Sequence, residues 1–442
     1  MIDALCAYPS YTSREKAPWL GDIPSHWDME RAKCFLREVD DRSETGKELL
    51  LSVSHITGVT PRSEKKITMF LAESNVGYKL CRPGDVVINT LWAWMAALGV
   101  TNHAGIVSPA YGVYRPRPGC VILSKYLDYL LRTPQYAAEY LRRSTGVRSS
   151  RMRLYPDKFL CIPLIVPPPA EQAAIVRLLN YADSRFGSVI RAKRRQLALV
   201  GEARLAITEE ALRETDTSPL RLGAAAELVG RPIDRRPDQT YIPVGLRNRG
   251  RGIFHKAPAR GADLGDSEFF SLVAGDFILS GQFAWEGAVA LASQRDTGCV
   301  ASHRYHVLRG RPGHLASAVL MAFFRTPFGG LLLDQHSRGA AGRNRPLNLR
   351  ALLKEKIPIP SPSAQKRIVA AIELEAKVAE SVQSTLDSVL EYRARLIADV
   401  VLGRVDARAA SARLPDGMDA DRSADLPIEN EDDGADEEEI PA

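Results

Sequence analysis

The chain has 442 residues, of which 45% are hydrophobic, so it is long enough for two or three domains with buried cores. No apolar run approaches the roughly 20 residues that span a bilayer, and the N-terminal segment lacks the basic and apolar regions of a secretion signal. The six cysteines are scattered without metal-binding spacing. These features predict a cytoplasmic protein with reduced thiols, no metal site and no membrane partner.

Charge is divided unevenly along the chain. The net charge is +6, but residues 416–442 contain twelve Asp or Glu and a single Arg. Residues 1–415 therefore hold 58 basic and 41 acidic residues, a net charge of +17. The high positive charge of residues 1–415 favours a polyanion as partner, and nucleic acid above all. A solvated surface with a solubilising tail is the alternative.

Two apolar segments of similar sequence lie 191 residues apart: GDVVINTLWAWMAALGV (residues 84–100) and GDFILSGQFAWEGAVAL (residues 275–291). Each opens with a Gly-Asp turn, which predicts a buried strand directly after it, at Asp85–Asn89 and Asp276–Leu279. We expect the tryptophans that follow these strands, at equivalent positions 94 and 285, to pack in the cores that duplicated domains would share.

The similarity continues towards the C-terminus at a nearly constant offset. Helices are predicted at Leu123–Leu131 and Leu315–Phe324, each ending before Thr-Pro. Further matched pairs are IVS and YGVY (106–114) with VAS and YHVL (300–308), RTP (132–134) with RTP (325–327), and PPPAEQAAIVRLL (167–179) with PSPSAQKRIVAAI (360–372). The period is the size of a domain, so the sequence predicts two copies of one mixed α/β domain rather than a solenoid.

Each copy ends in a proline-rich stop, after which a long stretch has almost no Gly or Pro. Apolar or small residues there recur at alternating spacings of four and three, the pattern of a paired-helix seam. The seam positions are Ile175, Leu179, Ala182, Phe186 and Val189 in the first stretch, and Val378, Val382, Thr385, Val389, Tyr392 and Leu396 in the second. Two helices of about 40 residues, roughly 60 Å long, are expected to pair antiparallel; ordinary surface helices are the alternative.

Motifs of catalysis are missing from the sequence. It contains no GxxxxGK[ST] phosphate loop, no NPPY- or DPPY-like tetrapeptide, no GxGxxG after a strand and no HExxH. Asp85 and Asp276, each behind a glycine, are interpreted as turn aspartates that cap backbone amides. His55, His103 and His303 have no spacing that supports a Ser/His/Asp arrangement. The chain is therefore predicted not to be an enzyme.

The features that remain suit recognition of nucleic acid. Gly- and Ser-rich loops carry arginines at equivalent places in both copies, and the planar guanidinium fits phosphate oxygens or the O6/N7 edge of guanine, as an asparagine amide fits adenine. Solvated flexible loops are the alternative. The candidate DNA-binding residues are Arg62, Lys65, Lys66, Asn89, Trp92, Arg148, Arg151 and Arg153 in the first copy and Arg249, Arg251, Gln282, Arg338, Arg343, Asn344 and Arg345 in the second.

The order of several motifs resembles the specificity subunit of type I restriction–modification enzymes from residue 19 to about Gly403. The motifs are WLGDIPSHWDMERAK (19–33), DDRSETGKELLLSVS (40–54), PGDVVINTLWAW (83–94), GIVSPAYGVYRP (105–116) and the PPxxEQ-type helix start. One departure is Ser363-Ala364-Gln365, where the first copy has Ala170-Glu171-Gln172. The acidic tail is another, and one hypothesis is that it discourages non-specific DNA contact.

With the repeat, the resemblance implies an α+β fold with two duplicated mixed α/β target-recognition domains separated by two long antiparallel coiled-coil helices. We expect the first recognition domain, with an N-terminal segment, at residues 1–165, and the second at 217–360. The spacer helices are expected at 166–216 and 361–403. An acidic, disordered tail is expected at 404–442.

The resemblance also implies a function. Each recognition domain would read one half of a split sequence in double-stranded DNA, while the helices fix the gap and dock two methyltransferase subunits; motor–nuclease subunits would join for cleavage. No cofactor is expected on this chain, whereas S-adenosylmethionine, ATP and Mg are expected on the partners, which would methylate a flipped adenine. The alternatives are a recognition subunit of a methyltransferase-only or orphan system, and an enzyme that acts alone on nucleic acid.

Overall fold

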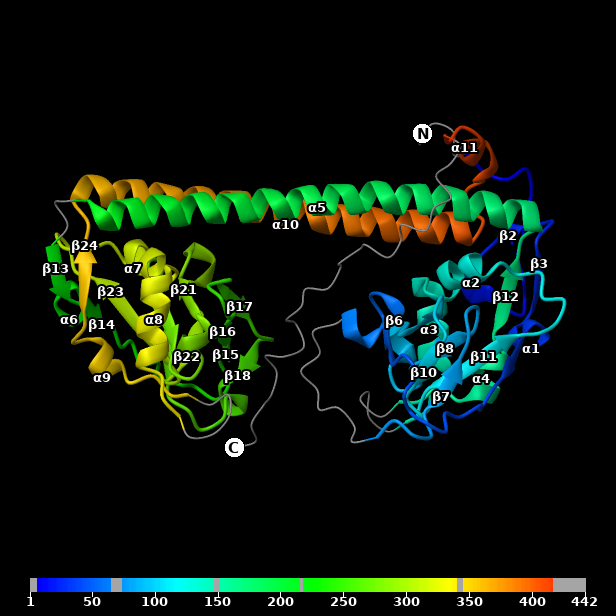
Figure 1. Ribbon diagram of the computed structural model, residues 1–442, viewed down its shortest axis with the longest axis horizontal. Coiled ribbons are helices and arrows are strands. Elements are labelled where there is room, and N and C mark those ends of the chain that lie inside the picture. The colour runs from blue at the N-terminus through cyan, green and yellow to red at the C-terminus, as the bar shows by residue number, and fades with distance from the viewer. Residues whose placement is uncertain (1–5, 65–73, 147–151, 215–217, 340–344, 416–442) are drawn as a thin grey trace. The chain divides into compact units, whose positions relative to one another are not determined.

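The computed structural model describes residues 6–64, 74–146, 152–214, 218–339 and 345–415. Contacts divide the chain into two compact units: unit 1 comprises Met1–Arg191 with Leu386–Ala442, and unit 2 comprises Ala192–Thr385 (Figure 1). Each unit contains one copy of the sequence repeat and a part of both long helices. None of the described helices is long and apolar enough to cross a membrane.

Unit 1 is built on a four-stranded antiparallel sheet with the strand order β4-β11-β8-β9. Every residue of β8 and β9 is buried, which explains why these strands read as continuous apolar runs instead of alternating patterns. The strand predicted at Asp85–Asn89 is confirmed as β8, one residue shorter at each end. The strands are β4 (Leu36–Glu38), β8 (Val86–Ile88), β9 (Leu98–Val100) and β11 (Gly112–Pro116).

Short ladders and helices complete the described part of unit 1. The antiparallel ladders are β1 (Tyr11–Thr12) with β2 (Ile23–Pro24), β3 (Asp28–Arg31) with β12 (Pro163–Val166), β5 (Leu51–Ser54) with β6 (Gly58–Pro61), and β7 (Lys79–Cys81) with β10 (Gly105–Val107). The helices are α1 (Ala32–Phe35), α2 (Ser124–Leu131), α3 (Pro134–Arg143), α4 (Pro156–Leu160) and α11 (Arg408–Ala412), with 3-10 helices η2 (Pro18–Leu20), η3 (Arg62–Glu64) and η4 (Ala93–Met95).

Unit 2 repeats the sheet, here with the order β14-β23-β20-β21. The register is repeated as well: Val86 lies opposite Tyr114 in unit 1, and Phe277 lies opposite Leu308 in unit 2, at positions that the sequence repeat aligns. The duplication inferred from sequence is therefore a duplication of structure. The strands are β14 (Ala226–Leu228), β20 (Phe277–Ser280), β21 (Val289–Leu291) and β23 (Tyr305–Gly310).

The smaller elements of unit 2 largely follow those of unit 1. The ladders are β13 (Ser218–Arg221) with β24 (Lys356–Ile359), β16 (Val244–Leu246) with β17 (Ile253–His255), β19 (Phe269–Ser271) with β22 (Val300–Ser302), and β15 (Thr240–Tyr241) with β18 (Ala259–Arg260). The helices are α6 (Leu222–Ala225), α7 (Ser317–Phe324), α8 (Pro327–Gln335) and α9 (Leu349–Leu352), with 3-10 helices η6 (Gly261–Asp263), η7 (Ala284–Glu286) and η8 (Gln294–Asp296).

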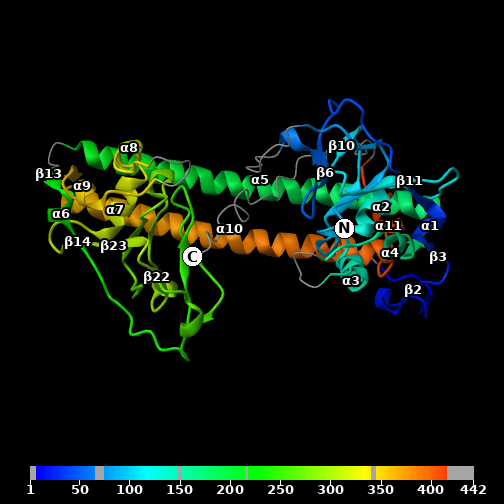
Figure 2. The ribbon, with the colours of Figure 1, turned by 90° about the horizontal axis from the view of Figure 1, so that it is seen from below.

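The two long helices are α5 (Pro169–Arg213, 45 residues) and α10 (Pro362–Val401, 40 residues), which lie side by side in Figure 1 and Figure 2. In unit 1, Arg393 on α10 binds Asp183 on α5 with two hydrogen bonds of 2.7 and 3.0 Å. In unit 2, Arg204 on α5 lies 3.1 Å from Glu375 on α10. The larger α5 number pairs with the smaller α10 number, so the helices are antiparallel.

The predicted seam is right at most positions and wrong at Val189. Ile175 and Leu179 are fully buried, and the rings of Phe186 and Tyr392 meet edge to face at 5.8 Å. Val189 is 41% exposed, however, while its neighbour Ile190 is 3% exposed. A straight α-helix turns every 3.6 residues rather than 3.5, so a strict heptad pattern drifts off the buried stripe.

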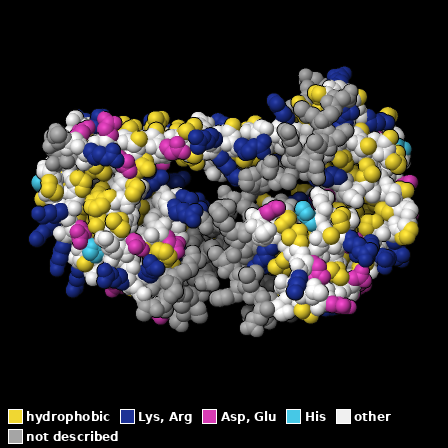
Figure 3. Space-filling view, viewed as in Figure 1, with side chains coloured by type: hydrophobic (Ala, Val, Ile, Leu, Met, Phe, Trp, Pro, Cys, Tyr) yellow, Lys and Arg dark blue, Asp and Glu magenta, His cyan; other side chains and the backbone are white. Residues whose placement is uncertain are grey.

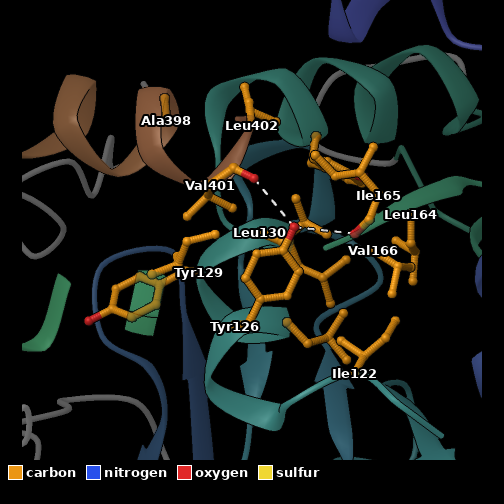
Figure 4. Packing of buried hydrophobic residues seen from close by; sticks show 14 of the residues in the cluster. Ile122, Tyr126, Tyr129, Leu130, Leu164, Ile165, Val166, Ala398, Val401 and Leu402 are labelled. Atoms are coloured by element: carbon orange, nitrogen blue, oxygen red, sulfur yellow. Dashed lines mark hydrogen bonds between the residues drawn. The ribbon is translucent and has the colours of Figure 1, made fainter. Parts of the chain in front are cut away.

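A buried tyrosine joins three elements in the core of unit 1. Tyr126 on α2 donates its hydroxyl hydrogen bond towards the carbonyls of Ile165 (3.2 Å) and Val401 (3.3 Å), at the ends of β12 and α10 (Figure 4). Figure 4 shows Leu130 and Leu402 in the same cluster. This contact fixes α2 and the end of β12 to the last turn of α10.

The tail begins later than expected. Residues 404–415 were assigned to it, but α11 lies here, and Ala407, Ala410 and Leu414 are buried in the main core of unit 1. The Asp406 N–H also donates to the Cys6 carbonyl at 2.7 Å. The small apolar residues between the charges form a buried stripe, which composition alone conceals. Residues 416–442 lie outside the described residues. The predicted fold class, α+β with a duplicated mixed α/β domain and two long antiparallel helices, is confirmed.

The first turns of α5 and α10 are held by equivalent glutamines. Gln172 and Gln365 each bind two carbonyls and one N–H through their side-chain amides, which joins the long helix to the loop before α2 or α7. The partners of Gln172 are the Val121 and Pro167 carbonyls (3.1 and 2.9 Å) and the Leu123 N–H (2.7 Å); those of Gln365 are the His314 and Pro360 carbonyls (2.8 and 3.0 Å) and the Ala316 N–H (3.0 Å).

Candidate nucleic-acid interface

In both units the strand next to the sheet edge runs directly into a 3-10 helix, and the predicted site residues gather around this turn. We name residues 89–95 the unit 1 tip and residues 280–286 the unit 2 tip. Each 3-10 helix ends at a residue in the left-handed region, Ala96 (φ 59°) or Gly287 (φ 72°). This conformation costs an alanine on the order of 1 kcal/mol, so in unit 1 the surrounding contacts hold the turn in a shape that glycine adopts freely.

Buried aspartates hold the strands that carry the two tips. Asp85 accepts from the Arg82 N–H and Asp276 from the Val273 N–H, each at 2.9 Å, which confirms the predicted role in capping turn amides. Both carboxylates also bind arginine. Arg115 forms a two-pronged contact with Asp85 at 3.0 and 2.9 Å.

Asp276 has two arginine partners, Arg231 (2.7 and 3.1 Å) and Arg309 (2.6 Å). Burial alone would raise the pKa of the Asp276 carboxyl, but the hydrogen bonds from Arg231, the Val273 amide and Arg309 outweigh it, so the pKa lies below its ordinary value. The carboxylate stays charged at neutral pH. These aspartates are occupied by structural contacts and have no free role in catalysis.

At the unit 1 tip the structure brings Asn89 and Arg62 to one tyrosine. Asn89 Nδ2 donates to the Tyr111 hydroxyl at 3.2 Å, and Asn89 Oδ1 accepts from the Leu91 N–H at 3.3 Å. Burial raises the pKa of Tyr111, and the nearby positive charge of Arg62 partly offsets that rise. The charge of Arg62 therefore acts on the same tyrosine that Asn89 binds, although the two residues are 27 positions apart in the sequence.

Arg153 joins the same tip from the C-terminal side. Its Nε donates to Thr90 Oγ1 at 3.1 Å and its Nη2 to the Ala110 carbonyl at 3.3 Å. The guanidinium also lies 5.9 Å from the Tyr155 ring centre. Arg153 is thus held in one orientation at Thr90, within the unit 1 tip.

At the unit 2 tip a nearby arginine stacks on a tryptophan. Arg345 lies 4.5 Å above the ring of Trp285 and forms an ion pair with Asp334 at 3.2 Å. Trp285 and Trp94 are half-buried, so the predicted packing in the core is right only in part. Trp285 Nε1 is a buried donor with no acceptor among the described residues.

A hairpin loop joins the unit 2 tip through its backbone. The N–H groups of Arg249 and Gly250 donate to the Glu286 and Gly287 carbonyls at 2.9 and 2.7 Å, and Asn248 Nδ2 donates to the Glu286 carboxylate. Arg249 is exposed and has a φ of 59°, in the left-handed region that a tight turn requires. The turn that carries Arg249 is therefore part of the tip surface.

The other predicted residues of unit 2 lie nearby or at its margin. Gln282 lies within the tip, its N–H donating to Ser280 Oγ at 3.2 Å. Arg251 Nε donates to the Asn248 carbonyl at 3.0 Å, and Arg338 Nε donates to the Gln335 carbonyl at the end of α8 at 3.3 Å. Six predicted residues lie outside the described residues: Lys65, Lys66, Arg148, Arg151, Arg343 and Asn344.

Some residues of this surface were missed by the sequence. Tyr111 and His306 line the two tips, and Phe283 is the exposed counterpart of Trp92. His306 Nε2 would lie 3.3 Å from a Cβ atom placed on Gly281, and burial lowers its pKa, so it is neutral at physiological pH. The repeat gave a signal for both aromatic residues, since Tyr111 lies in the repeated YGVY and Phe283 is aligned with Trp92 at the offset of 191.

The arginine of the repeated Arg-Thr-Pro motif holds a hairpin in each unit. Arg132 Nη2 donates to the carbonyls of His55 (3.1 Å) and Ile56 in the β5–β6 turn. Arg325 packs against Gly250 in the β16–β17 turn, where a Cβ atom would lie 2.8 Å from its Nε. Since β6 leads to Arg62 and the β16–β17 turn carries Arg249, these arginines position the predicted contact residues.

The His255 cluster of unit 2 does not form a catalytic relay. Cys299 Sγ (3.8 Å) and Asp296 Oδ1 (2.8 Å) both contact His255 through the same atom, Nε2, so the three cannot act as a nucleophile–base–acid relay. Among the described residues no group of three or more His, Cys, Asp or Glu is placed to hold a metal ion.

On the face drawn in Figure 3, Lys and Arg side chains lie on both units.

No protein-family model matches the sequence, and no curated protein matches it. A chain from a study of complex assembly and conformational transition of the type I R-M system matches with a TM-score of 0.54 and 15% identity, covering 86% of this chain and 98% of that one. This likeness shows a shared fold. The HsdS subunit from Thermoanaerobacter tengcongensis matches at 16% identity (TM-score 0.41, 86% and 98% covered), and the type I restriction-modification S subunit from M. genitalium at 10% (TM-score 0.40, 86% and 96% covered).

Proposed function

We propose that this chain is the specificity subunit of a type I restriction–modification complex, a non-catalytic protein that binds double-stranded DNA at a bipartite sequence. The duplicated tip is the observation that supports this most. Asp85 and Asp276 hold the same strand in both units, yet Asn89-Thr90-Leu91 stands where unit 2 has Ser280-Gly281-Gln282. Two modules that read different half-sites would need this combination: the same strand held in the same way, with different polar side chains after it.

Charge supports DNA as the ligand. Residues 1–415 carry a net charge of +17, and each tip holds an arginine in a fixed orientation, Arg153 or Arg345. A guanidinium held in this way loses little conformational entropy when it binds guanine or a phosphate. Phosphate contacts would supply most of the affinity, and side chains at the tips would supply the discrimination.

The catalytic steps belong to partners in this proposal. Two methyltransferase subunits would dock on the charged faces of α5 and α10 and bring S-adenosylmethionine, and motor–nuclease subunits would bring ATP and Mg. The fold shared with a chain of the type I R-M system supports this assignment. The described residues supply recognition and positioning, and the complex would act on cytoplasmic DNA.

The test begins with the target sequence, obtained by methylation-sensitive long-read sequencing of the host genome. The chain, co-purified with its partners, is then titrated with duplexes that contain both half-sites, one half-site or neither. We expect the highest affinity for the duplex with both, and a log affinity that falls with log salt by about 0.9 for each phosphate contacted. Equal affinity for all three duplexes would overturn the proposal.

Arginine variants locate the binding surface. Arg153→Ala and Arg345→Ala should each weaken specific binding by about 1–3 kcal/mol if the guanidinium reads a base. Arg311→Ala is the matched control, because Arg311 is an exposed arginine outside both tips and both long helices, and its partner is Glu227 at 3.6 Å. An equal loss in all three variants would indicate general electrostatics rather than recognition at the tips.

A further inference from the structure

Each tip presents an exposed aromatic side chain at the same position. Trp92 is 52% exposed and Phe283 is 37% exposed. Both precede the 3-10 helix of their tip, with nearly equal backbone angles: φ −118° and ψ 13° for Trp92, and φ −121° and ψ 20° for Phe283. The duplication has kept an aromatic residue in the open at this point, although the residues around it differ.

The backbone beneath each ring is fixed on both sides. The Trp92 carbonyl accepts from the N–H groups of Met95 (3.0 Å) and Ala97 (3.2 Å), and the Trp92 N–H donates to the Asn89 carbonyl (3.0 Å). The Phe283 carbonyl accepts from two N–H groups at the same distances, those of Glu286 and Ala288. The Phe283 N–H donates to Ser280 Oγ at 3.0 Å. Each ring therefore projects from a rigid turn.

Strain at the unit 1 turn is a separate observation. Ala96 is held with a φ of 59°, a conformation that alanine disfavours and that glycine adopts in the other copy. Strained backbone persists only where the surrounding contacts fix it, and it often accompanies functional sites. The shape of the turn, and with it the direction of the aromatic residue, is kept despite the less suitable residue.

Each tip also holds an arginine in a fixed orientation. Arg153 donates a hydrogen bond to Thr90, two positions before Trp92, and Arg345 lies over Trp285, two positions after Phe283. A surface that carries both an exposed ring and an oriented guanidinium suits a nucleotide, whose base offers a π face and whose phosphate offers a negative charge. A protein partner would also accept aromatic and arginine side chains, but the basic charge of the chain favours DNA.

We infer that Trp92 and Phe283 are the base-contacting aromatic residues of the two half-sites, each stacking on a base face at an opened base-pair step. The inference rests on the proposed function and adds the two residues and the form of contact. Inside an intact duplex both base faces are covered by neighbours, so stacking needs a step that is kinked or a position from which a base has been flipped. A rigid ring would fill that gap and hold the step open.

The test uses the chain co-purified with its partners and duplexes that carry 2-aminopurine at successive positions of both half-sites. Trp92→Ala should weaken binding roughly 5- to 150-fold, the range of base–aromatic stacking, and should change 2-aminopurine fluorescence in one half-site only. Phe283→Ala should do the same in the other half-site. Trp92→Phe and Phe283→Trp keep a ring and should retain binding.

Controls separate this inference from the proposed function. Phe328→Ala removes an equally open ring, 50% exposed on α8, and should leave DNA binding unchanged. If the unaltered chain does not prefer duplexes with both half-sites, the proposed function fails. If it does, but Trp92→Ala and Phe283→Ala bind like it with unchanged fluorescence, only the stacking inference is overturned. If Trp92→Ala and Phe283→Ala bind DNA normally but no longer co-purify with the other subunits, the stacking inference is also overturned, and the rings contact a protein partner instead.

Discussion

The first turns of the two long helices carry the same residue at one position, Gln172 and Gln365, and different residues at the position before it. Gln172 and Gln365 bind equivalent backbone groups. Glu171 binds Trp27 Nε1 (2.9 Å) and His26 Nε2 (2.7 Å), with Arg408 at 3.5 Å. The position equivalent to Glu171 in unit 2 is Ala364, which is buried. A group that contacts its own repeat is kept in both copies, while a group that contacts the chain ends is present only where those ends pack.

This comparison explains why the second copy lacks the acidic residue of the first. Ala364 stands in the place of Glu171 because the described part of unit 2 has no counterpart of the N-terminal segment around Trp27 or of α11. The same distinction applies at the tips. Asp85 and Asp276 are buried, and each accepts from a turn amide and from arginine, whereas Arg153 and Arg345 are half-buried and have unlike partners.

The largest effect is expected for the buried aspartate of unit 2. Asp276→Ala should lower the free energy of unfolding of unit 2 by about 3–5 kcal/mol, because it leaves Arg231 and Arg309 without their buried partner. Asp85→Ala should cost less in unit 1, since Arg115 keeps Asp41 at 3.2 Å. Urea unfolding followed by hydrogen exchange in each unit measures both changes. A larger loss for Asp85→Ala would contradict the comparison.

A smaller effect is expected at the helix starts. Glu171→Ala should cost about 1–3 kcal/mol, because the Trp27 indole N–H loses its acceptor in a buried place. Ala364→Glu, the reverse change, should destabilise unit 2, since a buried carboxylate there has no equivalent of Trp27. If Ala364→Glu were neutral in thermal unfolding, the acidic side chain would not depend on the packed chain ends.

Replacing either hairpin arginine, Arg132 or Arg325, with alanine should lower the free energy of unfolding by about 1 kcal/mol. Arg132→Ala frees the His55 and Ile56 carbonyls, so hydrogen exchange should rise in the β5–β6 turn. Arg325→Ala leaves Glu375 paired with Arg204, whose pKa is lowered by burial and by the charge of Arg325, so the loss is partly offset. Arg213→Ala, an exposed change on α5, is the control and should alter neither hairpin. If hydrogen exchange in both turns stayed unchanged, Arg132 and Arg325 would not position these hairpins.

The smallest effect is expected in how the free energy of unfolding depends on pH in the acidic range. The pKa of Asp276 is lower in the folded chain than the value of about 3.9 for an unfolded aspartate. Its contribution to stability is therefore complete above that value and is lost as the pH falls through the folded pKa. Asp276→Asn should flatten the fall in unfolding free energy below about pH 4. An identical pH profile for both chains would show that the folded pKa is not lowered.

Repetition and periodicity made much of this protein readable from its sequence. The 191-residue offset between GDVVINTLWAW and GDFILSGQFAW located equivalent strands, and the long stretches without Gly or Pro predicted α5 and α10. These features depend on local preferences and on which face of an element is apolar. The sequence therefore determined the duplicated α+β architecture, the turn aspartates and the helix pair.

Only the tertiary structure decided which side chains share a surface. Asn89 and Tyr111, or Asn248 and Glu286, are far apart in the chain, and no local pattern links them. It also decided that Ile190 rather than Val189 is buried, and that residues 404–415 pack into unit 1 instead of starting a tail. Contacts between distant segments depend on how whole elements pack, and their side chains need no common spacing, so pairs of this kind leave no periodic signal in the sequence.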